Sequence, residues 1–124
     1  MRNPCLHLDR VDAVLRTVKT CAVRDEAALQ AAIHVALAQA GIAARREAVL
    51  APRCRVDLLT EQGIGIEVKR GKPNRYRVAE QVQRYAKTGK LKGLVLVMDR
   101  VILPVDVPIP YRFVSLNMNW GLST

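Results

Sequence analysis

The chain has 124 residues, 50% of them hydrophobic, and carries a formal net charge of +9. This length predicts one domain over residues 1–124, with a core that needs no metal or disulfide in order to fold. No apolar run reaches the roughly 20 residues that cross a membrane, and the N-terminus is unlike a signal peptide. Three cysteines without a CxxC pair, Cys5, Cys21 and Cys54, predict free thiols in a reducing compartment, so we expect a cytoplasmic protein with no membrane partner.

The net charge favours a polyanionic partner. Lys and Arg number 20 against 11 Asp and Glu, a balance that is typical of proteins that bind nucleic acid. Aromatic residues make up only 4% of the chain, too few for a set of base-stacking platforms. The phosphate backbone is therefore the contact that we expect.

Two amphipathic helices are predicted first. The helix over residues 9–20 has one apolar stripe, made of Val11, Val14, Leu15 and Val18. The second helix runs over residues 25–40, because Asp25 is a good N-cap and Gly41 is a typical C-terminal stop. Its buried face is expected to comprise Leu29, Ile33, Leu37 and the alanines at positions 32, 36 and 40.

Strands and a third helix follow. A strand near residues 44–50 ends before Pro52, and the alternating segments 53–60 and 63–69 predict a hairpin with a loop at 61–63 and a positive φ at Gly63. A helix over residues 74–88 begins after Pro73 and closes at Gly89. The apolar run 94–98 predicts a buried strand, the prolines at 104, 108 and 110 an extended loop, and residues 111–117 an edge strand.

The predicted hairpin brings acidic residues together. A loop at residues 61–63 pairs Thr60 with Ile64, and counting outward from that pair puts Asp57 opposite Glu67. Directly opposed Cβ atoms lie roughly 4.5–5.5 Å apart, so the two carboxylates repel each other unless a cation lies between them. Mg²⁺ meets this need, since it binds one or two carboxylates together with water and phosphate.

Alternation along each strand predicts which side chains share a face. In the second strand of the hairpin, Glu67 and Lys69 share a face with Gly65, and the core-facing side chains are Ile64, Ile66 and Val68. In the first strand, Asp57 shares a face with Arg55 and Leu59, and the opposite face carries Cys54, Val56 and Leu58. Lys69 is then beside the two acids, where it can orient a water or stabilise a phosphate, as metal-assisted hydrolysis requires. The alternative is a half-exposed hairpin with a surface salt bridge.

Two further groups lie near this hairpin in the predicted arrangement. Glu26 is at the edge of the core-facing stripe of the second helix, where it either reaches the metal or complements the helix dipole. Gln81 and Tyr85 are i,i+4 neighbours on the inner face of the third helix, with Val78, Val82 and Ala86. Their polar groups need partners, which either the site or the solvent at the edge of the core supplies.

Cations surround the candidate site. Nine Lys and Arg lie between residues 69 and 92 with one acid, Glu80, whereas a solvated helix face normally interleaves charges of both signs. This crowding predicts a groove for phosphates. The candidate DNA-binding residues are Arg55, Arg70, Lys72, Arg75, Arg77, Arg84 and Lys87.

These motifs resemble the PD-(D/E)XK nuclease superfamily. "RVD" at 55–57 is similar to its first acidic motif, "EVK" at 67–69 to its second, and "QVQRY" at 81–85 to the Gln-x-x-x-Tyr helix of RecB-type nucleases. The resemblance covers residues 25–99 and implies an α/β fold with a restriction-endonuclease-like core, a central mixed β-sheet flanked by helices in the order αβββαβ. Residues 9–20 would add an N-terminal helix and residues 100–124 a C-terminal extension.

The resemblance also implies roles for individual residues. Asp57 and Glu67 would bind Mg²⁺, for which Mn²⁺ would substitute, and Lys69 would be the catalytic lysine. Glu26 would be the helix carboxylate, and Gln81 and Tyr85 would support the site. Val56 stands where the superfamily's name has proline. The stripe of the N-terminal helix is left with two explanations, packing on the sheet or formation of a homodimer.

The expected function is a Mg²⁺-dependent deoxyribonuclease that recognises DNA structure rather than sequence, in repair, recombination or a phage or defence setting. The first alternative is a nucleic-acid-binding module on the same fold that does not cut. The second is a small RNA- or ribosome-associated protein, for which the net charge of +9 would suffice but which leaves the acid–acid–lysine triplet unexplained.

Overall fold

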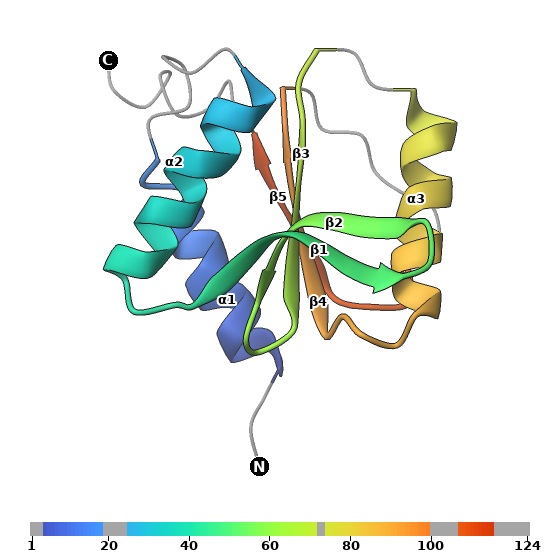
Figure 1. Cartoon of the computed structure of the whole chain (residues 1–124), viewed down its shortest axis with the longest axis horizontal. Helices are drawn as coiled ribbons and strands as arrows, with labels where there is room; N and C mark the ends of the chain where they lie inside the picture. Colours follow the sequence, from blue (N-terminus) through green and yellow to red (C-terminus); the bar gives the residue numbers. More distant parts are fainter. Residues whose placement is uncertain (1–3, 19–24, 72–73, 100–106, 116–124) are drawn as a thin grey trace.

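A mixed five-stranded sheet with helices on both faces organises the computed structural model, which describes residues 4–18, 25–71, 74–99 and 107–115. The helices are α1 (Pro4–Leu15), α2 (Glu26–Gln39) and α3 (Arg75–Lys87). The strands are β1 (Ala44–Ala51), β2 (Cys54–Thr60), β3 (Ile64–Lys69), β4 (Gly93–Met98) and β5 (Tyr111–Ser115) (Figure 1). The predicted α/β class and the order of these elements are confirmed.

The strands lie in the sheet in chain order, β1-β2-β3-β4-β5. Strand β2 is antiparallel to both β1 and β3, whereas β4 runs parallel to both β3 and β5. Helix α3 makes the crossover from β3 to β4, the connection that parallel strands require. Because β3 and β4 are covered on both faces, every residue of β4 and all but the last of β3 are buried.

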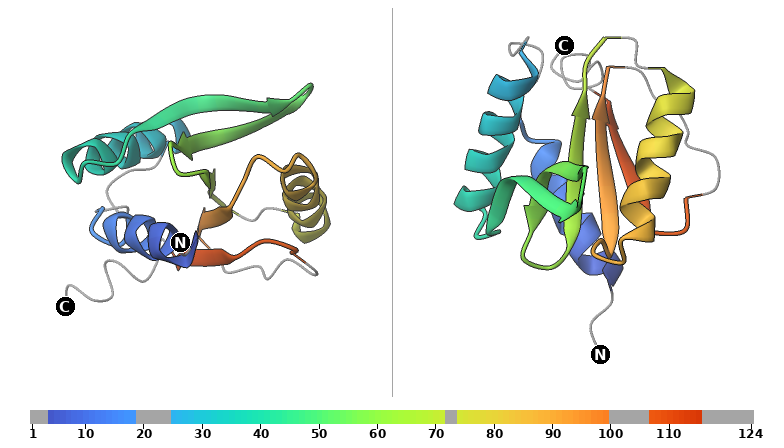
Figure 2. Two further views of the ribbon diagram at one scale, coloured as in Figure 1. Left: turned by 90° about the horizontal axis from the view of Figure 1, so that it is seen from below. Right: turned by 45° about the vertical axis from the view of Figure 1, so that its right-hand side comes forward.

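Each face of the sheet has its own core. Helices α1 and α2 lie on one face and α3 lies on the other, as the view along the sheet in Figure 2 shows. The core under α1 and α2 includes Leu15, Ile33 and Ile66, and the core under α3 includes Val82 and Leu96. Within the described residues, no helix combines the length and the apolar character needed to cross a membrane.

Helix α1 begins and ends earlier than the sequence predicts. It spans Pro4–Leu15 instead of residues 9–20, because proline is well tolerated in the first helical turn and β-branched Thr17 and Val18 are weaker helix formers. Leu8, Val11 and Leu15 are at most 2% exposed and pack into the core under α1 and α2. The apolar stripe of α1 therefore packs on the sheet, which is the first of the two explanations given for it.

The predicted hairpin register between β2 and β3 is confirmed where the two strands pair. Leu58 lies opposite Ile66 and Leu59 opposite Gly65, and Gly63 has the expected positive φ of 90°. Continued by one residue, this register puts Asp57 opposite Glu67. The loop is held by Thr60, whose hydroxyl oxygen accepts a hydrogen bond of 3.0 Å from the Ile64 amide.

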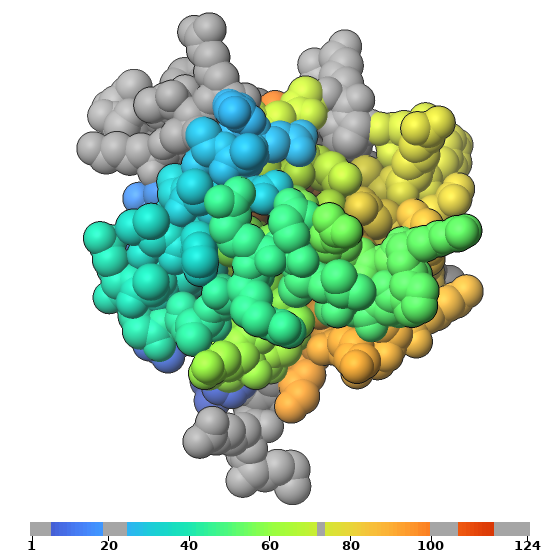
Figure 3. Space-filling model, in the orientation of Figure 1, coloured from blue at the N-terminus to red at the C-terminus, as the bar shows by residue number. Residues whose placement is uncertain are grey.

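Burial alternates along β2 as predicted, but the core that the buried side chains meet changes at Asp57. Leu58 packs under α1 and α2, but Cys54 and Val56, which were expected on the same face as Leu58, pack under α3. The residue of β1 that lies opposite Asp57 in the register is Glu47, which has a positive φ of 51°. This left-handed residue interrupts the pleat, and the hairpin of β1 and β2 bends across the sheet towards α3 (Figures 1 and 3).

The expected ends of α2 and α3 agree with the structure to within a residue, and Asn74, which was expected inside the third helix, is its N-cap. Asp25 caps α2, Asn74 caps α3, and Gly41 and Gly89 follow α2 and α3 with positive φ. Expectations for Cys21, Lys72, Pro73 and Pro104, for residues 19–20 and 116–117, and for most of the C-terminal extension lie outside the described residues. The side chain of Cys5 lies outside them as well, and Cys54 is a buried free thiol.

The packing of α1 gives a first test. Leu15→Ala removes a buried leucine, and we expect it to lower the free energy of unfolding by about 2–5 kcal/mol. Leu6→Ala is the matched control on the same helix, because Leu6 is 64% exposed and its truncation should cost little. Urea unfolding at several protein concentrations measures both variants. A loss for Leu15→Ala that depends on protein concentration would instead point to a dimer interface.

Candidate functional site

Two carboxylates lie where β2 separates from β3. Glu67 is only 3% exposed, and Asp57 is half-buried on the opposing strand. The Asp57 amide donates a hydrogen bond of 3.3 Å to Glu67 Oε1, and the Val68 amide donates one of 2.8 Å to Asp57 Oδ2. Each acid thus accepts a hydrogen bond from the backbone of the opposite strand, beyond the last paired residues of the two strands, and this brings the two acids together.

Tyr85 closes the site from α3. Its hydroxyl oxygen is 3.0 Å from Glu67 Oε1 and 2.9 Å from the carbonyl oxygen of Arg55. A phenol has a single proton, so it donates to one of these acceptors at a time. A protonated Glu67 could donate to the Tyr85 oxygen while Tyr85 donates to Arg55, which allows both contacts to be hydrogen bonds.

Lys69 supplies the positive charge next to the acids. Its Nζ is 3.2 Å from Glu67 Oε2, and its side chain is 27% exposed, against 4% for that of Glu67. The ammonium group therefore contacts a buried carboxylate on one side and solvent on the other. The structure brings Asp57, Glu67, Lys69 and Tyr85 together, as predicted.

The pKa values reflect the burial of the two acids. Burial, together with the negative charge of Asp57, raises the pKa of Glu67 to about 7, against the opposing effects of Lys69 and Tyr85. Burial also raises the pKa of Asp57, against the opposing effects of the Val68 amide and Lys69. The pKa of Tyr85 is raised by burial and by the charge of Glu67. The site holds more negative charge than its own cation neutralises.

Glu26 lies beside the site rather than between the two acids. Its Oε2 accepts a hydrogen bond of 3.1 Å from the Arg70 amide, at the C-terminal end of β3. It is near enough for its negative charge to raise the pKa of Asp57. Among the described residues, no three His, Cys, Asp or Glu side chains are grouped closely enough to hold a metal ion. The carboxylates that face each other are therefore Asp57 and Glu67, and a metal-binding role for Glu26 stays a prediction.

Some of the predicted DNA-binding cations form ion pairs with acids, and others are exposed to solvent. Arg70 pairs with Asp99 at 3.3 Å, and Arg55 lies 3.8 Å from Glu47. Arg70 also has a buried nitrogen, Nη1, with no hydrogen-bond partner. The cations of α3 are exposed along the helix: Arg75, Arg77, Arg84 and Lys87. Lys72 lies outside the described residues.

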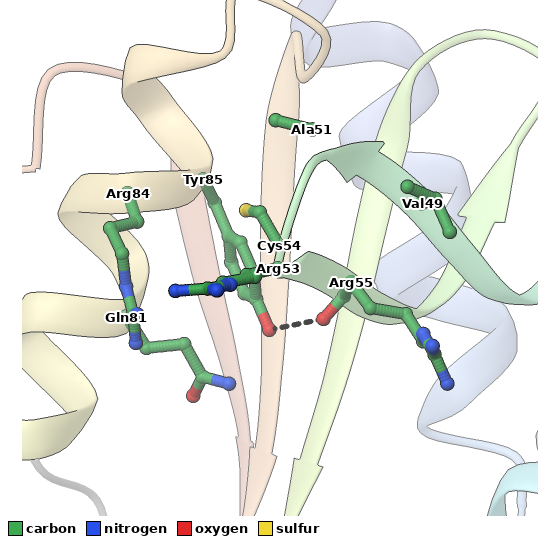
Figure 4. A pocket seen from close by; sticks show the side chains of 8 residues that line it. All are labelled: Val49, Ala51, Arg53, Cys54, Arg55, Gln81, Arg84 and Tyr85. Carbon is green, nitrogen blue, oxygen red and sulfur yellow. Dashed lines mark hydrogen bonds between the residues drawn. The ribbon is translucent and has the colours of Figure 1, made fainter.

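Gln81 lies beside Tyr85 rather than on the acidic pair, to which no hydrogen bond from it is found among the described residues. It is partly buried and lines a pocket of about 380 Å³ between the end of the β1–β2 hairpin and α3 (Figure 4). The pocket is also lined by Val49, Ala51, Arg53, Cys54, Arg55, Arg84 and Tyr85. Tyr85 is thus shared, because its ring lines the pocket and its hydroxyl contacts Glu67.

Sequence reasoning missed three residues near the site. Glu47 lies opposite Asp57 and raises its pKa, Arg53 lines the pocket, and Asp99 binds both Arg70 and the Gly71 amide. Counting the register of the first hairpin across Pro52 and Arg53 would have identified Glu47. Asp99 follows directly after a buried strand, a position where functional carboxylates are frequent in parallel sheets.

Comparison of the chain with protein families, with curated proteins and with solved structures finds no match.

The raised pKa of Glu67 predicts how stability depends on pH. A carboxyl group whose pKa rises from 4.5 to about 7 on folding binds more protons in the folded state, so stability is full below pH 4.5 and falls as the pH rises to about 7. We expect Glu67 to contribute a loss on the order of 3 kcal/mol over this range, measured by urea unfolding without divalent cations. Glu67→Gln should remove most of this dependence. An unchanged pH profile in that variant would show that Glu67 is not the titrating group.

Proposed function

We propose that this protein is a Mg²⁺-dependent deoxyribonuclease that hydrolyses phosphodiester bonds at the Asp57–Glu67–Lys69 site. The observation that carries the proposal is the pair of facing carboxylates, one of them 3% exposed, with an ammonium group 3.2 Å from the more buried one. If only the backbone needed acceptors here, neutral Asn and Gln would accept the same hydrogen bonds without placing two negative charges together.

We also propose that the core over residues 25–99 is restriction-endonuclease-like. Support comes from the order αβββαβ, from the antiparallel arrangement of β1, β2 and β3, and from the parallel crossover through α3 to β4. Helix α1 and strand β5 extend this unit at its two ends. The three short motifs fall on β2, β3 and α3, and they contribute Asp57, Glu67, Lys69 and Tyr85 to one site.

The residues of the site fit a hard divalent cation. Asp57 and Glu67 offer carboxylate oxygens, the ligands that Mg²⁺ and Mn²⁺ favour. Both carboxyl pKa values are raised, partly by repulsion between negative charges, and a cation would relieve that repulsion. When bound, Mg²⁺ supplies a Lewis acid that polarises the phosphate and lowers the pKa of a water molecule.

The other side chains position and balance charge. Lys69 is placed to stabilise the negative charge that develops on the phosphate, because its ammonium group contacts Glu67 and still reaches solvent. Tyr85 fixes the orientation of Glu67 through its hydroxyl group. In the reaction, water forms a new P–O bond and one ester P–O bond breaks, which leaves a phosphate monoester and an alcohol.

DNA is the substrate that the surface charge favours. The exposed cations of α3 and Arg70 at the end of β3 lie on either side of the segment that joins these two elements. Contacts from such cations go to phosphates and carry no sequence information, which agrees with recognition of DNA structure rather than sequence.

Substitutions at the site test the proposal directly. Glu67→Gln and Lys69→Ala should each lower DNA cleavage by more than about a hundredfold, because the first removes a carboxylate that would hold Mg²⁺ and the second removes the ammonium group that stabilises charge on the phosphate. The measurement is cleavage of labelled duplex, single-stranded, flap and four-way-junction DNA with Mg²⁺, Mn²⁺ or EDTA.

Glu61→Gln is the matched control, because Glu61 is an exposed acid in the loop of the same hairpin. It should cut at the wild-type rate, and circular dichroism should show all three variants folded. Cleavage by Glu67→Gln and Lys69→Ala at the wild-type rate would refute the assignment of the site.

The alternative is a module on the same fold that binds nucleic acid without cutting. Such a module would explain the exposed cations equally well, but it would not explain the facing carboxylates. Calorimetry separates the two functions: the nuclease should bind Mg²⁺ or Mn²⁺ in its DNA complex, and Glu67→Gln should weaken this binding by about tenfold or more. A complex that binds neither metal would favour the binding module.

A further inference from the structure

The pocket between the β1–β2 hairpin and α3 has a lining unlike that of the acidic pair beside it. It has a volume of about 380 Å³ and is lined by three arginines and no carboxylate. Its position follows from the bend at Glu47 and Asp57, which carries the end of the hairpin across the sheet to α3. Tyr85 belongs to both sites, because it lines the pocket and its hydroxyl group contacts Glu67.

Two of the three arginines are available for a ligand. The guanidinium of Arg55 extends away from α3 and lies 3.8 Å from Glu47, whereas that of Arg53 extends towards α3 (Figure 4). Arg84 lines the pocket from α3, and neither Arg53 nor Arg84 forms an ion pair with an acid in the described part of the chain. Two like charges on opposite walls repel each other, and an anion between them would remove that repulsion.

The backbone at Arg53 supports a functional position. Arg53 has a positive φ of 60°, a conformation that costs energy for a residue with a large side chain and that glycine or asparagine would adopt more readily. In the view of Figure 4 the amide of Gln81 lies below the side chains of Arg53 and Arg84, and Val49, Ala51 and Cys54 add apolar surface to the lining. The pocket therefore offers two cations, an amide and apolar surface.

We propose that this pocket binds a phosphate monoester of a nucleotide. The charge of about −2 on a phosphate monoester at neutral pH matches the two free guanidinium groups, whereas a phosphodiester within a DNA strand carries only one negative charge. Arg53 and Arg84 hold the phosphate, and the sugar or base lies against the apolar surface next to Gln81. The source that we expect is the phosphorylated end of a DNA strand, and this choice of source rests on the proposed function, because hydrolysis of DNA creates such ends.

Binding measurements in EDTA test this pocket without any cleavage. The probes are one labelled oligonucleotide with a 5′-phosphate, with a 3′-phosphate or with hydroxyl groups at both ends, at constant ionic strength. We expect one phosphorylated form to bind about tenfold more tightly than the hydroxyl form, the effect of charge-assisted hydrogen bonds. Arg53→Gln and Arg84→Gln should each remove most of this preference. Arg45→Gln, an exposed arginine of β1 outside the pocket, should keep it.

Two further arms separate this inference from the proposed nuclease. Glu67→Gln should keep the preference for the phosphate even though it loses cleavage. The other arm adds a nucleoside monophosphate as a competitor of the labelled oligonucleotides. If it competes, if this competition requires Arg53 and Arg84, and if the protein shows no preference among the oligonucleotides, the ligand is a free nucleotide. Equal binding of all oligonucleotides with no competition by the mononucleotide, or a preference that survives in the variant with both arginines replaced, would overturn the proposal, whatever the outcome of the cleavage assay.

Discussion

Burial of Glu67 beside Asp57 is the constraint on which the rest of the site depends. A carboxylate that is 3% exposed and faces a second carboxylate has lost most of its solvation and gains repulsion in return. The ammonium of Lys69, the hydroxyl of Tyr85 and two backbone amides contact the two carboxylates and stabilise them. These contacts only partly offset the cost, because the pKa of Glu67 still rises to about 7. In the proposed nuclease, a divalent cation would offset the remaining repulsion.

The bend of the first hairpin links this constraint to the fold. Strands β2 and β3 pair through Leu58 and Leu59 and then separate, which leaves the amides of Asp57 and Val68 to the two carboxylates. The same bend carries the end of the hairpin to α3 and forms the wall of the arginine-lined pocket. The acidic pair and the basic pocket are therefore two results of one irregularity in β1 and β2, and they share Tyr85.

Charge is divided between these neighbouring sites. Negative side chains gather around the end of β3, where Glu26 and Glu47 both raise the pKa of Asp57, and positive side chains line the outer part of α3 and the pocket. In the proposed nuclease, this division would let phosphates of the substrate meet the cations and a metal ion meet the acids. A protein that only needed solubility would have no reason to separate its charges in this way.

The sequence by itself determined what depends on local spacing: α2 with its Asp25 cap, α3 with its stop at Gly89, the loop at Gly63, and the register that puts Asp57 opposite Glu67. These follow from short-range sterics and hydrogen bonding, which a few neighbouring residues decide. Only the tertiary structure decided the change of core along β2 at Asp57, the pairing of Arg70 with Asp99 and of Arg55 with Glu47, and the pocket at Arg53. Each of these requires segments distant in the chain to meet, and the bend at Glu47 that brings them together is a left-handed conformation that glutamate rarely adopts.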